Sequence, residues 1–495
     1  MEVELKLLID PSDVSKLLKD PLLKPATKAH SQRVSLENIY FDTPDHELQA
    51  ARIGLRLRCA GKQWLQTIKG GGQVIGGLHS RQELEYPVSG RALDFAPAAD
   101  SPWADWFDEE RITRLKPVFA TNFQRTVRVL RPTDEVEIEL ALDQGEIVVT
   151  DKTEPICEIE LELKAGPVSA LFDIALAIAS RYNIHIENAS KAERGYRLAY
   201  GEQITAPQKW TSPTVAADTP LTDAVSTLAH SLLDSFQRNE TGFLRRPDES
   251  EYLHQMRVTL RRLRVLLSAF RPHLPDPDKV SFLMTELRWL GTVLGNARDW
   301  DVLLGETLPP LFEQIGPHTA RSRLHARLVA RGYAAHDEAR LTLSSRRYQL
   351  LLLEWGRYFA TLTNQETLIH FDEALGPVLK KYAKRLQATL SKAAEDGLAR
   401  HQSRIAGKKM RYLGEFGQMA YGGKRYEKFA EWLAQLQSQF GHSNDDRVAN
   451  GLLADIVNHV RKTDEAELIG LLRGWLMARQ VGQITLSQDL PRTYW

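Results

Sequence analysis

Met1-Glu2-Val3-Glu4-Leu5-Lys6 opens the chain, and its residue pattern is the starting point for predicting the fold of the first half. Successive side chains of a β-strand point to opposite faces, so Glu2, Glu4 and Lys6 share one face, and Val3 and Leu5 share the other. Two carboxylates followed by a lysine suit a metal held beside a phosphate, because hard cations prefer oxygen ligands and phosphate oxygens prefer cationic donors. The hexapeptide alone also fits the solvent-facing edge of a half-buried strand. A metal and phosphate site is favoured only if the same pattern recurs further along the chain.

The same separation of ionic and apolar faces recurs in predicted strands up to about residue 202. Arg56 and Arg58 share a face in one strand, whereas Glu158, Glu160 and Glu162 share a face in another. Like charges in a row are unfavourable unless cations lie among them. Many antiparallel strands with one ionic face each are accommodated by a closed barrel with a polar lumen. The pattern therefore favours a barrel that binds metal ions and a polyanion.

The composition is that of a globular protein with more than one domain. The 495 residues are 43% hydrophobic and 26% charged, with neither a run of apolar residues that could span a bilayer nor a basic and apolar signal segment. We therefore expect a cytoplasmic protein with no membrane partner. Residues 1–205 hold 25 basic and 32 acidic residues, a net charge of −7, and the remainder carries +7. This asymmetry fits an acidic metal site in one half and an anion-binding surface in the other.

The apolar spacing becomes helical after residue 220. Leucine-rich faces at three- and four-residue spacing predict an all-α bundle, whereas the stretch before it, ITAPQKWTSPTVAADTP, reads as a linker. The predicted fold class is thus α+β and multidomain. We divide the chain into a β-rich domain at residues 1–203, a linker at 204–220 and a helical domain at 221–495.

The helical half contains a repeated basic motif. Residues 254–264, HQMRVTLRRLR, are echoed 147 residues later by residues 401–411, HQSRIAGKKMR, with a basic residue at every matching basic position. Helical offsets of 0, 3, 7 and 10 fall within roughly 80° of one another. The resulting basic stripes consist of His254, Arg257, Arg261 and Arg264 in the first motif, and of His401, Arg404, Lys408 and Arg411 in the second. Two facing stripes would form a cationic groove for a long polyanion, although a single stripe also fits a solvated helix face. The two histidines either add charge as the pH falls or cap and pack.

The motifs of the first half resemble those of the CYTH family, the triphosphate tunnel metalloenzymes. The match starts with Glu-x-Glu-x-Lys at residues 2–6 and continues in order through residues 40–43, 55–58, 67–69, 142–146, 157–163 and 190–196. The resemblance implies an eight-stranded antiparallel tunnel that admits a linear triphosphate, with Mg²⁺ or Mn²⁺ as cofactor. By similarity, the metal ligands are Glu2, Glu4, Glu139, Asp143, Glu158 and Glu160. The implied phosphate-binding residues are Lys6, Arg56, Arg58, Lys69, Arg125 and Lys191. The implied catalytic residues are Glu2, Glu4, Lys6, Arg56, Arg58, Lys69, Glu158 and Glu160.

The second half resembles the CHAD domain, a helical bundle that often follows CYTH. The resemblance lies in the two basic stripes and in the segment LGNARDWDV at residues 294–302. It implies that the helical half binds inorganic polyphosphate. The implied contact residues are His254, Arg257, Arg261, Arg262, Arg264, His401, Arg404, Lys408, Lys409 and Arg411.

The two resemblances together imply a divalent-metal-dependent inorganic triphosphatase. Such an enzyme would hydrolyse tripolyphosphate to pyrophosphate and phosphate in the tunnel and would bind long-chain polyphosphate through its helical half. A class IV type adenylate cyclase and a non-catalytic polyphosphate-binding adaptor are the alternative functions. Nucleic acid is a less favoured partner, because few aromatic side chains are interleaved with the basic stripes to stack on bases.

Overall fold

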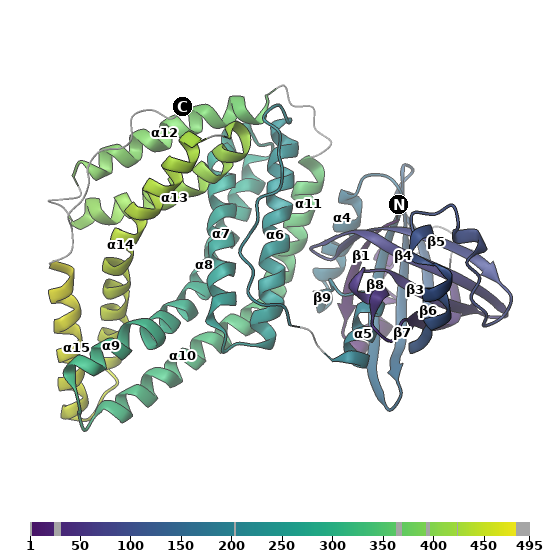
Figure 1. Ribbon diagram of the computed structural model, residues 1–495, viewed down its shortest axis with the longest axis horizontal. Coiled ribbons are helices and arrows are strands. Elements are labelled where there is room, and N and C mark those ends of the chain that lie inside the picture. The colour runs from purple at the N-terminus through teal and green to yellow at the C-terminus, as the bar shows by residue number, and fades with distance from the viewer. Residues whose placement is uncertain are drawn as a thin grey trace. The chain divides into compact units, whose positions relative to one another are not determined.

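The chain folds into two compact units (Figure 1). The computed structural model describes residues 2–23, 31–201, 204–362, 369–392, 397–422 and 424–481. The barrel unit consists of Met1–Thr205 together with Ser344–Thr361, and the helical unit consists of Ala206–Leu343 together with Leu362–Trp495. In the described part of the chain, no helix combines the length and the apolar character needed to cross a membrane.

The barrel unit is built on eight antiparallel strands that close into a ring. Their order is β5-β4-β3-β2-β6-β7-β8-β1, and pairing of β5 with β1 completes the circuit. The strands are β1 (Glu2–Ile9), β2 (Ser31–Asp42), β3 (Gly54–Ala60), β4 (Gln63–Ile75), β5 (Leu78–Val88), β6 (Lys116–Thr133), β7 (Val136–Val149) and β8 (Lys152–Ala165). A short strand, β9 (Ile184–Ile186), pairs with the end of β1. The closed barrel predicted for the first half is confirmed.

The period-two pattern of the strands sends apolar side chains outward and ionic ones into the lumen. Leu5 and Leu7 of β1 are fully buried in a core outside the ring, together with Ile159 and Leu161 of β8. Three helices contribute to the same core: α1 (Val14–Leu17), α4 (Ser169–Ala179) and α11 (Arg346–Leu362). The alternate residues of the same strands therefore line the barrel interior.

Helix α5 (Lys191–Tyr200) packs against aromatic side chains of the barrel. Its first turn is fixed by a capping box, in which Ser190 and Glu193 satisfy each other's backbone N–H groups. Gly195 permits close contact with the sheet, since a Cβ atom at this position would lie 2.1 Å from the ring of Phe119. The cap and the close packing together fix Lys191, the first residue of the helix.

Helix α11 lies within the predicted helical domain but packs in the barrel unit. Its Leu353 joins the outer core of the barrel. The Gln349 side chain accepts a hydrogen bond of 2.9 Å from the Ile186 backbone N–H in β9. Arg357 forms an ion pair of 2.6 Å with Asp173 of α4. The barrel unit is therefore discontinuous in sequence. Two further short helices, α2 (Glu47–Ala50) and α3 (Glu109–Arg114), complete it.

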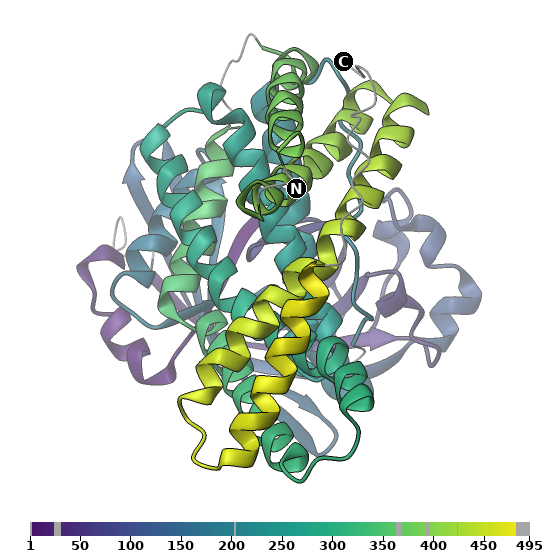
Figure 2. The same ribbon diagram turned by 90° about the vertical axis from the view of Figure 1, so that its left-hand side faces the viewer.

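The helical unit is built from packed helices with leucine-rich interiors. They are α6 (Leu221–Arg245), α7 (Ser250–Phe270), α8 (Pro277–Val302), α9 (Leu308–Ile315), α10 (Arg321–Leu343), α12 (Phe371–Leu390), α13 (Gly397–Tyr421), α14 (Lys424–Val457) and α15 (Thr463–Val481). Helix α7 packs against α6, α8 and α13, and α14 and α15 run side by side (Figure 2). This packing brings the two helices that carry the repeated basic motif, α7 and α13, into contact.

The residues before α6 have no regular secondary structure, but part of the stretch is held against this helix. Asn239 of α6 pairs with the backbone of Gln208 through two hydrogen bonds of 3.1 and 3.0 Å. The indole N–H of Trp210 donates to the Ser231 hydroxyl over 3.0 Å. These contacts fix the position of the Trp210 ring in the helical unit.

Candidate active site

Three carboxylates meet inside the barrel. Asp143 of β7 and Glu158 of β8 are direct cross-strand neighbours, and Glu160 lies two residues further along the same face. One oxygen from each of the three lies within 4.8 Å of the others, and all three residues are buried. Three oxygen donors at this spacing match the ligand preference of a hard divalent cation. The structure thus brings three of the six predicted metal ligands together.

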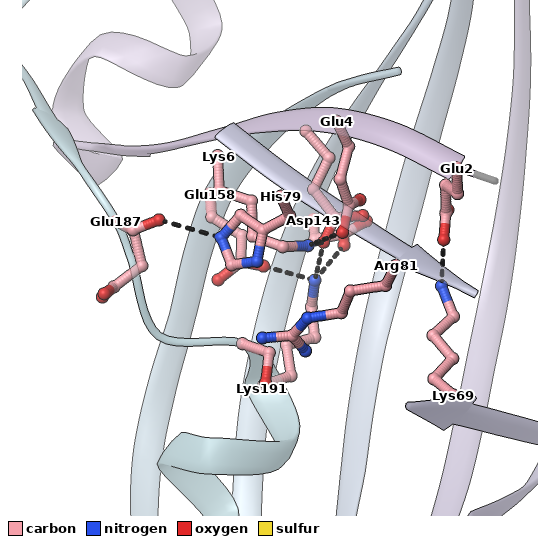
Figure 3. Close-up of polar contacts among 12 residues, drawn as sticks. Glu2, Glu4, Lys6, Lys69, His79, Arg81, Asp143, Glu158, Glu187 and Lys191 are labelled. Carbon is pink, nitrogen blue, oxygen red and sulfur yellow. Dashed lines mark hydrogen bonds and ion pairs between the residues drawn. The ribbon is translucent and has the colours of Figure 1, made fainter. Parts of the chain in front are cut away.

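Two lysines lie among these carboxylates (Figure 3). Lys6 is opposite Glu160 in the pairing of β1 with β8; its ammonium group is ion-paired with Glu160 and lies 2.9 Å from Glu4. The ammonium group of Lys191 lies 2.6 Å from Asp143 and 3.0 Å from Glu160. The predicted metal ligand Glu4 therefore reaches the same cluster through Lys6.

The opposite charges of this cluster stabilise one another's ionised forms. Burial disfavours the charge of Lys6, but Glu160 and Glu4 outweigh it and raise the pKa of Lys6 above its ordinary value. Burial likewise disfavours the charge of Glu160, and the cations Lys191 and Lys6 outweigh it and hold the pKa of Glu160 well below its usual range. Both signs of charge therefore persist at neutral pH inside a buried site.

Two arginines complete this end of the lumen. Arg125 of β6 donates two hydrogen bonds to Asp143, of 2.8 and 2.7 Å, and also contacts Glu160. Arg194 of α5 donates to Glu158 over 2.9 Å. Arg125 was predicted, whereas the sequence analysis missed Arg194. Its spacing of three from Lys191, which places both on one face of a helix, is a signal that could have identified it.

A second group of charges lies around the predicted phosphate ligands of β3 and β4. Lys69 contacts Glu2 at 2.7 Å and Glu83 at 3.0 Å, and Arg56 lies 3.6 Å from Glu83. Arg58 donates to the Asn38 side chain over 3.0 Å. Burial, together with the charges of Arg56 and Arg125, lowers the pKa of Arg58 to about 10.

Glu83 and its same-face neighbour Glu85 were missed by the sequence analysis. Glu85 lies 3.7 Å from Arg58, so both glutamates of β5 balance arginines of β3. Their shared face in the segment RQELE was visible in the sequence and could have identified them. Glu2 and Glu139, by contrast, lie outside the cluster of three carboxylates in the described structure. Glu139 is paired in register with Glu162.

A buried histidine also lines this part of the barrel. His79 of β5 is opposite Glu4 of β1, and only 1% of its surface is exposed. Burial and the charge of Lys6 lower the pKa of His79 to about 3, so the imidazole is neutral at pH 7. No sequence motif singled out this residue.

In the helical unit, Arg257 and Arg261 of α7 act on basic residues of α13: Arg261 on Arg404, and both on Lys408. Burial, Arg261 of α7 and Arg404 of its own helix lower the pKa of Lys408 to about 7, although Asp445 opposes them. Burial lowers the pKa of His254 to about 4, assisted by Arg298 and opposed by Glu251. Cations from α7 and α13 therefore act on one another across the contact between these helices, and His254 is neutral at pH 7.

Helix α8 supports the first basic stripe from one side. Arg257 donates to the Gly295 carbonyl over 2.9 Å and to Asp299 over 3.1 Å, both in the segment 294–302. Burial lowers the pKa of Arg264, assisted by Arg288 and Arg261. In the second stripe, the pKa of His401 is lowered by burial and by the charge of its neighbour Arg404.

Arg262 is placed differently from the other basic residues of α7. Its guanidinium donates to Glu415 over 2.7 and 3.2 Å and lies over the rings of Trp210 and Tyr412, at 5.0 and 5.2 Å. Arg411 lies 4.0 Å from the same Glu415. Among the described residues, Arg262 therefore differs from its neighbour Arg261 in being paired with a carboxylate. Lys409, also predicted to bind polyphosphate, is half-buried on α13.

Comparison with known proteins agrees with both halves of this description. Residues 1–196 match the CYTH domain model, and residues 227–454 match the CHAD domain model. The chain is 36% identical over 204 residues to an inorganic triphosphatase of Haemophilus influenzae; the alignment covers 41% of this chain and 56% of that relative. It is 28% identical over 391 residues to an uncharacterized protein of Mycobacterium tuberculosis, in an alignment that covers 74% of this chain and 70% of the relative.

A solved structure resembles the helical half. The crystal structure of the CHAD domain from the plant Ricinus communis is 31% identical, with a TM-score of 0.50, and the match covers 56% of this chain and 92% of that domain. The chain therefore joins a CYTH domain at residues 1–196 to a CHAD domain at residues 227–454.

Proposed function

We propose that the barrel is a divalent-metal-dependent inorganic triphosphatase of the cytoplasm, which hydrolyses tripolyphosphate to pyrophosphate and phosphate. The observation that carries this proposal is the buried cluster of Asp143, Glu158 and Glu160 with Lys6 and Lys191 inside a closed barrel. The name of the Haemophilus influenzae relative, an inorganic triphosphatase, supports it.

The donor set fits a divalent metal ion. Asp143, Glu158 and Glu160 offer carboxylate oxygens within 4.8 Å of one another, and oxygen is the ligand type that Mg²⁺ and Mn²⁺ prefer. These three residues would hold the metal, with Glu4 beside them through Lys6. When bound, the metal neutralises phosphate charge and lowers the pKa of a bound water molecule.

The lysines and arginines of the cluster would hold the reacting phosphate. Lys6, Lys191 and Arg125 are each paired with carboxylates of the cluster. Phosphate oxygens can replace those carboxylates as partners, so that positive charge faces the terminal phosphate. Phosphoryl transfer depends chiefly on such positioning and charge stabilisation.

The reaction needs no covalent intermediate with the protein. The oxygen of a water molecule forms a bond to the terminal phosphorus while the bond from this phosphorus to the bridging oxygen breaks. Pyrophosphate leaves with the bonding electron pair, and a proton of the water passes to a phosphate oxygen of the products. The other phosphates of a linear chain would be held by the positively charged side chains of β3 and β4, which are Arg56, Arg58 and Lys69.

We also propose that the helical unit binds inorganic polyphosphate in the groove between α7 and α13. The charge of Arg261 disfavours the charges of Arg404 and Lys408. The Nε atoms of Arg261 and Arg404 are buried without a hydrogen-bond partner in the described structure. A polyanion would relieve this repulsion and provide acceptors.

Phosphate release from tripolyphosphate, ATP and pyrophosphate tests the proposed activity. Each substrate is supplied with Mg²⁺, Mn²⁺ or EDTA, and cyclic AMP is measured in the ATP sample. We expect metal-dependent release that is fastest from tripolyphosphate. Cyclic AMP formation would identify a cyclase instead, and no release from any of the three substrates would leave a polyphosphate-binding adaptor.

A further inference from the structure

His79 has one ring nitrogen with a partner and one without. Its Nε2 atom lies 3.3 Å from the backbone carbonyl oxygen of Glu187. A carbonyl oxygen only accepts hydrogen bonds, so Nε2 carries the ring proton in this contact. In the neutral ring, Nδ1 then has a free lone pair and acts as an acceptor.

The Nδ1 atom of His79 is buried and has no hydrogen-bond partner in the described structure. Buried polar atoms of native proteins are paired as a rule, and an exception requires an explanation. Figure 3 shows the ring between Glu187 and the cluster that contains Lys6, Glu4 and Lys191. The unpaired acceptor therefore lies at the edge of the candidate active site.

A metal ion does not explain the unpaired nitrogen. His79 is not part of the group of potential ligand atoms formed by Asp143, Glu158 and Glu160. Its charged neighbours are the cations Lys6 and Arg81 and the anion Glu4, which opposes them, so cations outnumber anions around the ring and disfavour a further cation. A water molecule, which donates a hydrogen bond without bringing positive charge, satisfies the same nitrogen.

We propose that His79 is a further catalytic residue, whose Nδ1 accepts a hydrogen bond from the water that attacks the terminal phosphorus. This inference rests on the proposed triphosphatase function. The ring fixes one hydrogen of the water, so that an oxygen lone pair points at phosphorus. His79 orients the water and does not keep its proton, which passes to a phosphate oxygen of the products.

Glu187 holds the ring in this orientation from the opposite side. Its carbonyl accepts from Nε2, and its backbone N–H donates to the Lys6 carbonyl over 3.0 Å. The same short segment therefore ties together β1, which carries Lys6, and the ring of His79. A purely structural role for His79, as an anchor of this segment, is the competing explanation.

Two variants of His79 separate the two roles. His79→Asn keeps an oxygen near the position of Nδ1 but loses the contact with Glu187. His79→Gln places an amide N–H near the position of Nε2 and keeps that contact, but has no acceptor at the position of Nδ1. We expect kcat for tripolyphosphate to fall about 100-fold in His79→Gln, with KM little changed, and to fall far less in His79→Asn. Thermal unfolding of both full-length variants reports whether they fold.

The opposite ranking, or wild-type kcat in His79→Gln, would overturn the assignment. If the wild-type protein itself releases no phosphate from tripolyphosphate, the proposed function is wrong, and the role of His79 that depends on it is wrong as well. If the wild type is active and both variants match it, only the role of His79 is wrong.

Nitrogen NMR of the full chain with labelled histidine provides a readout other than activity. Among the 14 histidines, the signal of His79 is identified as the one that His79→Asn lacks. We expect an unprotonated Nδ1 whose resonance moves upfield when Mg²⁺ and a non-hydrolysable imido analogue of tripolyphosphate are added. An unchanged resonance, or one that responds fully to the metal alone, would contradict a water-mediated role.

Discussion

Arg261 and Arg262 are adjacent on α7, yet of the two only Arg262 has a carboxylate partner in the described structure, Glu415. Adjacent side chains on a helix differ by about 100° in direction. Arg262 therefore lies between Trp210 and Tyr412, whereas Arg261 faces Lys408 of α13. The same residue type thus serves packing at one position and presents unpaired charge at the next.

This pair provides a matched test of polyphosphate binding. Arg261→Ala should weaken the binding of long-chain polyphosphate and reduce its salt dependence by about one unit of log Kd per log salt, as for the loss of one phosphate contact. Arg262→Ala should leave that slope unchanged and lower the free energy of unfolding by about 0.5–3 kcal/mol. Binding titrations at several salt concentrations, with thermal unfolding, measure both. Equal loss of binding in the two variants would contradict the proposed groove.

The affinity for polyphosphate should fall as the pH rises above 7. Burial and the charges of Arg261, Arg404 and Arg257 hold the pKa of Lys408 at about 7, with Asp445 opposing. A bound polyanion favours the ammonium form, so binding above pH 7 takes up a proton and weakens by up to about tenfold per pH unit. Lys408→Arg, which stays charged, should flatten this dependence between pH 6 and 9 at constant ionic strength.

Lys408 also makes the free energy of unfolding depend on pH. The pKa of Lys408 is lower in the folded protein than its ordinary value of 10.5, so the unfolded chain binds more protons between pH 7 and that value. The contribution of Lys408 to the free energy of unfolding should therefore rise with pH across this window. Urea unfolding of the wild type and of Lys408→Met, compared at pH 7 and pH 9.5, measures it. We expect the difference in free energy of unfolding that favours Lys408→Met over the wild type to shrink at pH 9.5. A difference that grows with pH would contradict this prediction.

Glu160→Gln should lower kcat for tripolyphosphate by about 100-fold or more, since it removes charge from the centre of the cluster. Glu162→Gln is the matched control. Glu162 lies on the same face of β8 but is paired with Lys164 at 2.6 Å, outside the three-carboxylate cluster. We expect its kcat to stay within about threefold of wild type, in line with a substitution away from the reacting groups. Similar losses in both variants would place the metal elsewhere in the lumen.

Gly356→Ala should destabilise the barrel unit even though alanine favours helices. A Cβ atom at Gly356 of α11 would lie 2.2 Å from the ring of Phe172 on α4, and overpacking of this kind costs about 1–3 kcal/mol. At Gly291 of α8, where a Cβ atom meets nothing within 4 Å, the same substitution should stabilise by up to about 1 kcal/mol. Calorimetry of both full-length variants tests this contrast.

The faces of the strands could be read from the sequence because the period of a strand is two. The position of Glu4, Lys6, Glu158 and Glu160 inside the barrel follows from alternation alone. The closure of the ring through β5 and β1, by contrast, depends on pairing between distant segments. His79 acquires its neighbour Glu4 through that closure, and for this reason its position beside the cluster could not be predicted from the sequence.

The packing of α11 in the barrel unit could not be predicted from the sequence for a similar reason. Its leucines predict a buried helix but do not say which unit supplies the partner. The contacts of Leu353 and Gln349 with the barrel unit join segments far apart in the sequence. The repeated basic motif shows the opposite case, since helical spacing alone put Arg257 and Arg261 on one face and left Arg262 outside the stripe. The resemblance to the CHAD domain nevertheless implied Arg262 as a contact residue.

The discontinuity of the barrel unit has a consequence for synthesis on the ribosome. The chain leaves this unit at Thr205 and returns to it only at Ser344–Thr361. At about 5–20 residues per second, Thr361 is added roughly 8–30 s after Thr205. During that interval the nascent barrel lacks the helix that covers Phe172, and the first helices of the other unit are made before the barrel is complete. Folding of the two units is therefore interleaved in time, and a chain truncated soon after Thr205 leaves an apolar surface of the barrel exposed for good.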